Sequence, residues 1–143
     1  MTTPVMELVD VHVVHKTRTG GLFRPGTVRA VDGVSFSISR GETVGIVGES
    51  GSGKTTMARV LVGLQPATSG QVLFKGEPLR YNAAARRKLG RAVSVVFQDP
   101  ATALNPRMVV REQLLDPLNV HNVGEPNQRE ERVRELLRLV GLP

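Results

Sequence analysis

Apolar and polar residues alternate with the period of a β-strand near the start of the chain. Residues 5–14 are rich in valine, and residues 34–39 alternate an apolar residue with a serine. This pattern predicts two strands that each bury one face. The Asp32-Gly33 step before the second run is typical of a tight hairpin turn. The first forty residues are therefore predicted to form an antiparallel β element.

Two later segments are apolar without alternation. Residues 43–47 read TVGIV and residues 93–97 read VSVVF. Continuous runs of this kind are typical of strands buried on both faces of a mostly parallel sheet. A turn over 68–70, a short strand over 71–74 and a turn over 75–78 are predicted between them. With the helices described next, this order predicts an α/β layer.

Helical spacing of apolar residues appears between the two apolar runs. The positions that share one face are Met57, Val60, Leu61 and Leu64. They predict a helix with a buried stripe that ends near residues 63–66. Asn82 is a suitable N-cap for a basic helix over residues 83–90.

The last third of the chain begins with a loop, QDPATALNPRM, and then returns to helical spacing. A helix is predicted over residues 109–115, broken at Pro117, and another from Pro126, with Gly141 as its C-cap. Its buried face would carry Val133, Leu136, Leu137 and Val140. Apolar periodicity also favours core positions for Leu104, Met108 and Leu114, with contact to a membrane-spanning partner as the alternative.

Residues 48–55 read GESGSGKT and fit the pattern G-x-x-x-x-G-K-[ST]. Glycines let the backbone wrap a phosphate, and amides from about Gly51 to Thr56 would point inward at a helix N-terminus. Lys54 would neutralise phosphate charge, and the Thr55 hydroxyl is a hard oxygen ligand for Mg²⁺. A flexible glycine turn explains this Lys-Thr pair poorly. The loop is predicted to bind a nucleoside triphosphate.

Two classes of protein carry such a loop, and the rest of the sequence separates them. A small-molecule kinase usually has it in its first strand and helix, whereas here 47 residues precede Gly48. The second apolar run ends in Gln98, and a strand that delivers a carboxamide at its carboxyl end can place it beside a metal and a water. A small kinase is therefore the distant alternative.

Four segments carry a resemblance to a known family. They read RAVDGVSFSISRGETVGIVGESGSGKTT, VVFQDPATALNPRM, DPLNVH and ELLRLVGLP, and they cover most of residues 28–143. The chain resembles the N-terminal part of an ABC transporter ATPase, and more narrowly the importer branch for oligopeptides and dipeptides. The resemblance implies that residues 1–98, which include the β element, form an ABC-type P-loop core. Residues 99–143 would then be the start of a helical subdomain, and the chain as a whole would be an incomplete domain.

The resemblance also implies site residues. The cofactors would be ATP and Mg²⁺, and Gln98 would be the Q-loop glutamine that contacts Mg²⁺ and the attacking water. Gln98 and Lys54 are then the candidate catalytic residues, and Thr55 and Gln98 the candidate metal ligands. An aromatic ring of the family stacks on adenine where this chain has Lys16; His15 or Phe23 could replace it. The residues implied for the phosphates are Gly48, Glu49, Ser50, Gly51, Ser52, Gly53, Lys54, Thr55 and Thr56.

Family members act in pairs, and each loop is completed by an LSGGQ-like signature from the partner. They also use a catalytic glutamate after a later strand and a switch histidine beyond it. These 143 residues contain no LSGGQ-like run and no apolar strand that ends in Asp-Glu. Two interpretations follow: a truncated ATP-binding subunit whose turnover alone is negligible, or an inactive ATP-binding module or split-gene half.

Composition and charge exclude several other classes of protein. The chain has 40% hydrophobic residues and no cysteine, which predicts a globular core without disulfides or thiolate metal sites. Its net charge of +6 is dispersed and only 3% of residues are aromatic, which favours a solvated basic face over nucleic-acid binding. Neither a signal peptide nor an apolar run of membrane-spanning length is evident. A peripheral subunit at the cytoplasmic membrane face is expected, partnered by a second ATPase subunit, permease subunits and, indirectly, a substrate-binding protein.

Overall fold

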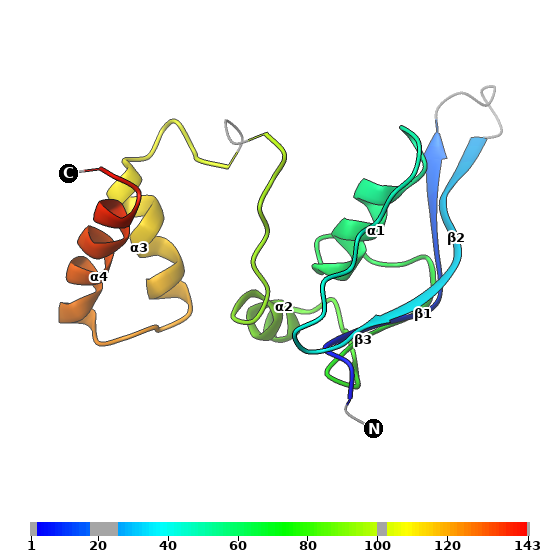
Figure 1. The fold of residues 1–143 in the computed structure, drawn as a ribbon, viewed down its shortest axis with the longest axis horizontal. Coiled ribbons are helices and arrows are strands. Elements are labelled where there is room, and N and C mark those ends of the chain that lie inside the picture. The colour runs from blue at the N-terminus through cyan, green and yellow to red at the C-terminus, as the bar shows by residue number, and fades with distance from the viewer. Residues whose placement is uncertain (1–2, 18–25, 100–102, 143) are drawn as a thin grey trace. The chain divides into compact units, whose positions relative to one another are not determined.

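The computed structural model describes residues 3–17, 26–99 and 103–142, which form two compact units, Met1–Ser94 and Val95–Pro143. Each unit is described by itself. The first holds β1 (Met6–Thr17), β2 (Gly26–Ile38), α1 (Lys54–Leu61), β3 (Ser69–Phe74), β4 (Glu77–Pro78) and α2 (Ala83–Gly90) (Figure 1). The second holds α3 (Val110–Val120) and α4 (Pro126–Leu139).

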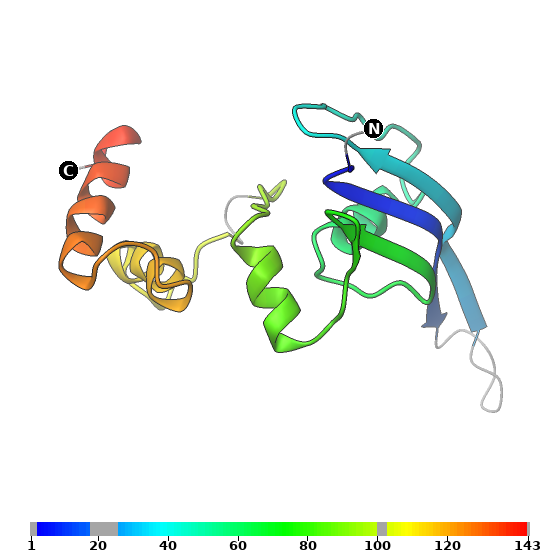
Figure 2. The same ribbon diagram turned by 90° about the horizontal axis from the view of Figure 1, so that it is seen from below.

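The first unit is built on a four-stranded sheet in the order β2-β1-β3-β4, and every neighbouring pair is antiparallel. The predicted antiparallel β element is thus confirmed. The sheet also takes in Glu77 and Pro78, which pair with Phe74 and Leu73, where the sequence predicted only a turn. Figure 2 shows α1 against one face of this sheet.

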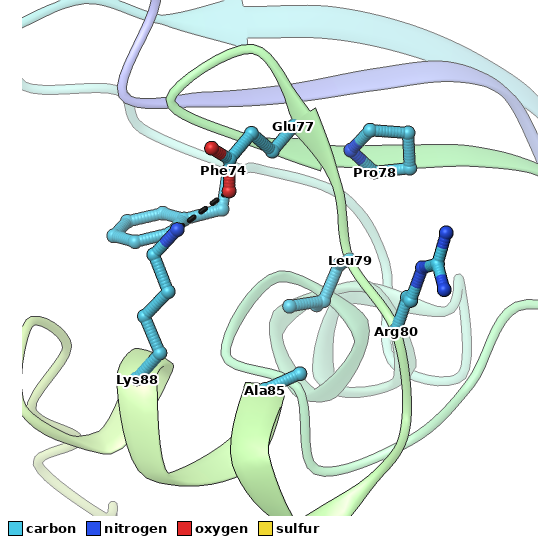
Figure 3. A pocket seen from close by; sticks show the side chains of 7 residues that line it. All are labelled: Phe74, Glu77, Pro78, Leu79, Arg80, Ala85 and Lys88. Atoms are coloured by element: carbon cyan, nitrogen blue, oxygen red, sulfur yellow. Dashed lines mark hydrogen bonds and ion pairs between the residues drawn. The ribbon is translucent and has the colours of Figure 1, made fainter.

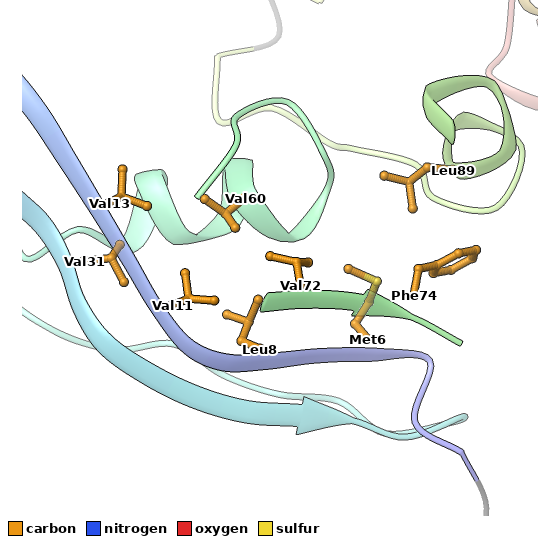
Figure 4. Close-up of a cluster of buried hydrophobic side chains, with 9 residues drawn as sticks. All are labelled: Met6, Leu8, Val11, Val13, Val31, Val60, Val72, Phe74 and Leu89. Carbon is orange, nitrogen blue, oxygen red and sulfur yellow. The ribbon is translucent and has the colours of Figure 1, made fainter. Parts of the chain in front are cut away.

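The core lies between that face and the two helices of the first unit. Val11 on β1 and Val60 on α1 are both fully buried, and Figure 4 shows Val60 and Leu89 directed at the side chains of β1 and β3. The predicted stripe is wrong at Leu64, which is 60% exposed. The reason is local: α1 ends at Leu61, and Gly63, with φ 72°, turns the chain away from the helical path.

The Asp32-Gly33 step does not form a hairpin turn, and that prediction is wrong. Both residues lie inside β2, where Val11 pairs with Val34 and Val13 with Val31, so β2 carries an extra residue. Gly33 has φ 67°. A left-handed glycine suits a β-bulge as well as a turn, because both need a backbone that other residues adopt at a cost.

The two continuous apolar runs are not strands in the described structure, which corrects the prediction for both. Residues 43–47 and 93–97 have no sheet partner among the described residues, and Val47 and Val96 are 96% and 97% exposed. A strand is defined by hydrogen bonds to a neighbour, so apolar composition alone does not produce one.

The helix predicted over 83–90 is confirmed as α2. The Asn82 side chain accepts a hydrogen bond of 2.8 Å from the Ala85 amide, which satisfies one of the unpaired donors of the first turn. The predicted break at Pro117 is wrong, because α3 runs to Val120 and the His121 amide still donates to the Pro117 carbonyl. A proline removes one helical hydrogen bond without preventing the next turn.

The second unit is a pair of helices with one fully buried apolar side chain, and one ion pair and one side-chain hydrogen bond join the two helices. Val133 is 1% exposed, as predicted, and Leu136 and Leu137 are half-buried. Arg111 of α3 pairs with Glu130 of α4, and Arg129 donates to the Asn119 side chain at 2.9 Å. Core positions were wrongly predicted for three exposed residues, namely Leu104, Met108 and Val140. Leu114 is half-buried.

A histidine joins the irregular parts of β1 and β2. His12 Nδ1 lies 2.9 Å from Asp32 Oδ1, and Nε2 lies 3.1 Å from Asp10 Oδ1. The Gly33 amide also donates to Nδ1, at 3.1 Å. One nitrogen cannot donate and accept at once. The contact to Asp32 suits an Nδ1 that carries a proton, and the contact to Gly33 suits an Nδ1 with a free lone pair. The hydrogen bond to Asp32 raises the pKa of His12 above its usual 6.5, with Asp10 acting in the same direction.

The free energy of unfolding is expected to fall as pH rises through the folded-state pKa of His12. Because the pKa of His12 is raised by folding, its contribution to the free energy of unfolding is fully present below 6.5, the pKa of the unfolded state. That contribution is lost as pH rises through the pKa of the folded state. The pKa of Asp32 is lowered by the same contact, so its contribution is lost in acid instead. Urea unfolding measured through the acid range, where Asp32 titrates, and above pH 6.5, where His12 titrates, gives the two changes in the free energy of unfolding.

His15 provides the matched control, since it lies in the same strand with an exposed side chain. His12→Gln should reduce the fall of the unfolding free energy near neutral pH, whereas His15→Gln should leave that fall unchanged. An unchanged profile in His12→Gln would show that another group titrates.

Candidate functional site

The glycine loop lies between the end of β2 and the start of α1. Figures 1 and 2 show residues 39–53 as an irregular segment that leads into α1, which begins at Lys54. Gly51 and Gly53 have φ of 83° and 91°, a region that other residues rarely adopt. The predicted order of glycine loop followed by helix is therefore present, although the strand predicted before it is not.

The Lys54 ammonium folds back across the loop. Its Nζ donates to the carbonyl oxygens of Gly48 at 2.7 Å and Glu49 at 2.6 Å, and lies 3.5 Å from Ser52 Oγ. The side chain is half-buried. An ammonium has three donors and no acceptor, so it is suited to exchange these neutral carbonyls for the oxygens of an anion.

The first turn of α1 offers backbone donors next to that ammonium. The first intrahelical bond runs from the Met57 amide to the Gly53 carbonyl at 2.9 Å. The amides of Lys54, Thr55 and Thr56 precede it and have no acceptor within the helix, as at every helix N-terminus. Together with the helix dipole they favour negative charge at this end.

A side chain at Gly53 would meet backbone, whereas one at Gly48 would meet a serine side chain that can move. A Cβ on Gly53 would lie 1.9 Å from the Ala30 carbonyl oxygen of β2, and one on Gly48 would lie 2.8 Å from Ser52 Oγ. Gly53 therefore lets the start of α1 approach the sheet backbone directly. This contact, which fixes the helix N-terminus against β2, was not predicted, because no pattern in the sequence identifies a backbone partner that is distant along the chain.

The donor set fits a phosphate group. It combines one ammonium, the first amides of α1, which have no acceptor within the helix, and, at Thr55, an exposed hydroxyl on the same helical turn. A hydroxyl oxygen is a ligand type that Mg²⁺ accepts. The loop residues Glu49, Ser50, Gly51 and Ser52 are exposed, so an anion would have access from solvent.

The other predicted site residues lie elsewhere. His15 lies in β1 opposite Val28, exposed, and Phe23 lies outside the described residues. Gln98 belongs to the second unit, where it is exposed at the end of the 93–97 segment. The structure brings the loop residues and Lys54 together; the roles of His15 and Gln98 remain predictions.

Comparison with known proteins identifies the family. The model of the ABC transporter family matches residues 31–143, which include the loop, much of the first unit and all of the second. The chain belongs to the ABC transporter family. The family assignment made from the sequence is thereby confirmed.

Individual ABC proteins resemble the chain over nearly its whole length. An oligopeptide transport ATP-binding protein, AppF of Bacillus subtilis, is 45% identical over 141 residues, covering 96% of this chain and 43% of the relative. A putative peptide import ATP-binding protein of Brucella abortus is 49% identical over 136 residues, covering 94% of this chain and 40% of the relative. The chain thus spans about two fifths of the length of these curated relatives.

Solved ABC structures share the fold. A dimer of the cassette MJ0796 in a post-hydrolysis state, bound to ADP and phosphate, matches with a TM-score of 0.78 at 25% identity, over 96% of this chain and 58% of that one. The cbiO1 structure from Clostridium perfringens gives 0.67 at 25% identity, over 98% and 51%. The predicted P-loop ATPase fold is therefore confirmed. Within the described residues, no helix combines the length and apolarity needed to cross a bilayer.

Proposed function

We propose that this chain is part of the ATP-binding subunit of an importer for oligopeptides or dipeptides. The observation that supports it is the loop between β2 and α1, where a lysine ammonium and a helix N-terminus converge within an ABC protein. The relatives are named as oligopeptide transport and putative peptide import ATP-binding proteins, which favours peptides as the cargo of the whole transporter.

Phosphate binding in this proposal is carried by the chain's own groups. Amides of residues 51–56 donate to phosphate oxygens, and Lys54 exchanges the Gly48 and Glu49 carbonyls for the β- and γ-phosphate oxygens. The exchange favours the nucleotide because a bond from an ammonium to an anion is stronger than a bond to a neutral carbonyl.

Three further residues complete the proposed site. Thr55 and Gln98 hold Mg²⁺, and Gln98 also orients the attacking water. When bound, Mg²⁺ neutralises charge on the phosphate oxygens. His15 stacks on adenine from the exposed end of β1.

In the whole protein, ATP binding closes a pair of such subunits against permease subunits at the cytoplasmic face of the membrane, and hydrolysis resets them. A substrate-binding protein delivers the cargo. The 143 residues alone are proposed to bind Mg-ATP with negligible turnover, because the family's signature and catalytic glutamate are not among them.

A comparison of adenine nucleotides tests the proposal. If the loop grips the β- and γ-phosphates, Mg-ATP and Mg-ADP should bind at least about tenfold more tightly than AMP, since AMP lacks the groups that Lys54 contacts. Displacement of a fluorescent ATP analogue from the chain gives the three dissociation constants.

Adenosine serves as the control for base stacking alone. Equal affinity for ATP, AMP and adenosine would contradict phosphate recognition by the loop, and with it the proposed function.

A further inference from the structure

A concave site lies in the first unit, away from the glycine loop. It is a cavity of about 320 Å³ between the β3–β4 hairpin and α2 (Figure 3). This volume is at the small end for ligand pockets. The residues that line it are Phe74, Glu77, Pro78, Leu79, Arg80, Ala85 and Lys88. None of them belongs to the P-loop.

The floor of the cavity is apolar. Phe74 is 6% exposed, and Leu79 and Ala85 are half-buried. Figure 3 shows the Leu79 side chain directed between Phe74 and Ala85. Phe74 and Leu79 both pack in or against the core, so the floor is held by the fold and does not depend on a ligand to form it.

The rim carries more positive than negative charge. Lys88 on α2 pairs with Glu77 on β4 at 2.5 Å, which neutralises that acid. Arg80 is exposed, and no carboxylate of the described residues pairs with it. A second cation stands close by, because Lys75 Nζ lies 5.3 Å from the centre of the Phe74 ring. The cavity therefore presents one free guanidinium beside an apolar surface.

This combination selects a chemical class of ligand. An apolar group gains by leaving water for the Phe74 and Leu79 surface, whereas a cation would be repelled by the rim. A guanidinium donates two parallel hydrogen bonds to a carboxylate, which matches the geometry of that group better than of a neutral amide.

We propose that this cavity binds a small carboxylate joined to an apolar group, with the apolar part on Phe74 and Leu79 and the carboxylate on Arg80. Two sources share this chemistry: a short free fatty acid, and the C-terminus of a peptide whose last residue is apolar. The site is independent of nucleotide binding, so it stands or falls separately from the proposed function.

Hexanoate and N-acetyl-leucine are the probes for the two sources, and hexanamide is the neutral control. NMR titration of the whole chain, followed on the methyl signals of Leu79 and Ala85, should show saturable binding of at least one carboxylate. Hexanamide should bind at least about tenfold more weakly, because it lacks the charge that Arg80 recognises.

Variants locate the site. Arg80→Gln should weaken carboxylate binding about tenfold, whereas Arg40→Gln, at an exposed arginine outside the cavity, should not change it. Ala85→Trp fills the cavity and should abolish binding, with circular dichroism to confirm the fold. The proposal is overturned if neither carboxylate binds, if hexanamide binds equally well, or if the shifts fall on residues 43–47 and 93–97 instead.

Discussion

Lys54→Ala is expected to weaken binding of Mg-ATP by about 100-fold, from removal of a charge-assisted contact to the phosphates. In the structure the ammonium already lies within the loop, held by two carbonyl oxygens at 2.7 and 2.6 Å. Little reorganisation is needed before it meets a phosphate. Isothermal titration calorimetry of the two proteins with Mg-ATP measures the difference.

Loss of affinity could also arise if the loop collapsed without its lysine, and a stability measurement separates the two causes. Lys54 is not fully buried, so urea unfolding should shift by less than about 1 kcal/mol. Lys75→Ala is the matched control, because Lys75 is exposed on the turn between β3 and β4, outside the P-loop. Equal ATP affinity in wild-type and Lys54→Ala would remove the basis of the nucleotide proposal.

Gly53→Ala is expected to destabilise the chain by about 3 to 4 kcal/mol and to abolish nucleotide binding. The new Cβ would lie 1.9 Å from the Ala30 carbonyl oxygen, so either α1 or β2 must move. The backbone there also has φ 91°, which adds the conformational cost of a left-handed residue. Because α1 carries the buried Val60, the displacement would reach the core.

Gly41→Ala separates the steric clash with Ala30 from the conformational cost of a left-handed backbone. Gly41 has a similar φ of 79°, but a Cβ there meets nothing within 4 Å. It should therefore cost only about 1 to 2 kcal/mol and leave nucleotide binding unchanged. Urea unfolding compares the two variants, and similar losses of stability would show that the Ala30 contact does not restrain the helix.

Local signals were reliable where neighbours along the chain decide the structure. Asn82 caps α2 as predicted, because the cap and its partner Ala85 are three residues apart. The end of α1 near Gly63 follows from the same kind of local backbone preference. The antiparallel pairing of β1 with β2 also followed from alternation, since each strand buries one face.

Predictions failed where distant residues decide. The runs 43–47 and 93–97 have the composition of buried strands, but neither pairs with any strand of the described sheet. Asp32-Gly33 has the composition of a turn, yet the pairing of β1 with both sides of it makes it a bulge. The residue types determine which backbone angles are accessible at low energy. The pairing with the neighbouring strand then decides whether those angles form a turn or a bulge.

By itself, the sequence determined the glycine loop, its lysine and threonine, and the helix that follows, because these depend on backbone freedom and donor chemistry within a dozen residues. Only the tertiary structure decided that the Lys54 ammonium rests on the Gly48 and Glu49 carbonyls, that Gly53 touches β2, and that an apolar cavity with a free arginine lies beside α2. Each of these is a contact set by how the chain packs, and packing depends on which residues meet across the fold.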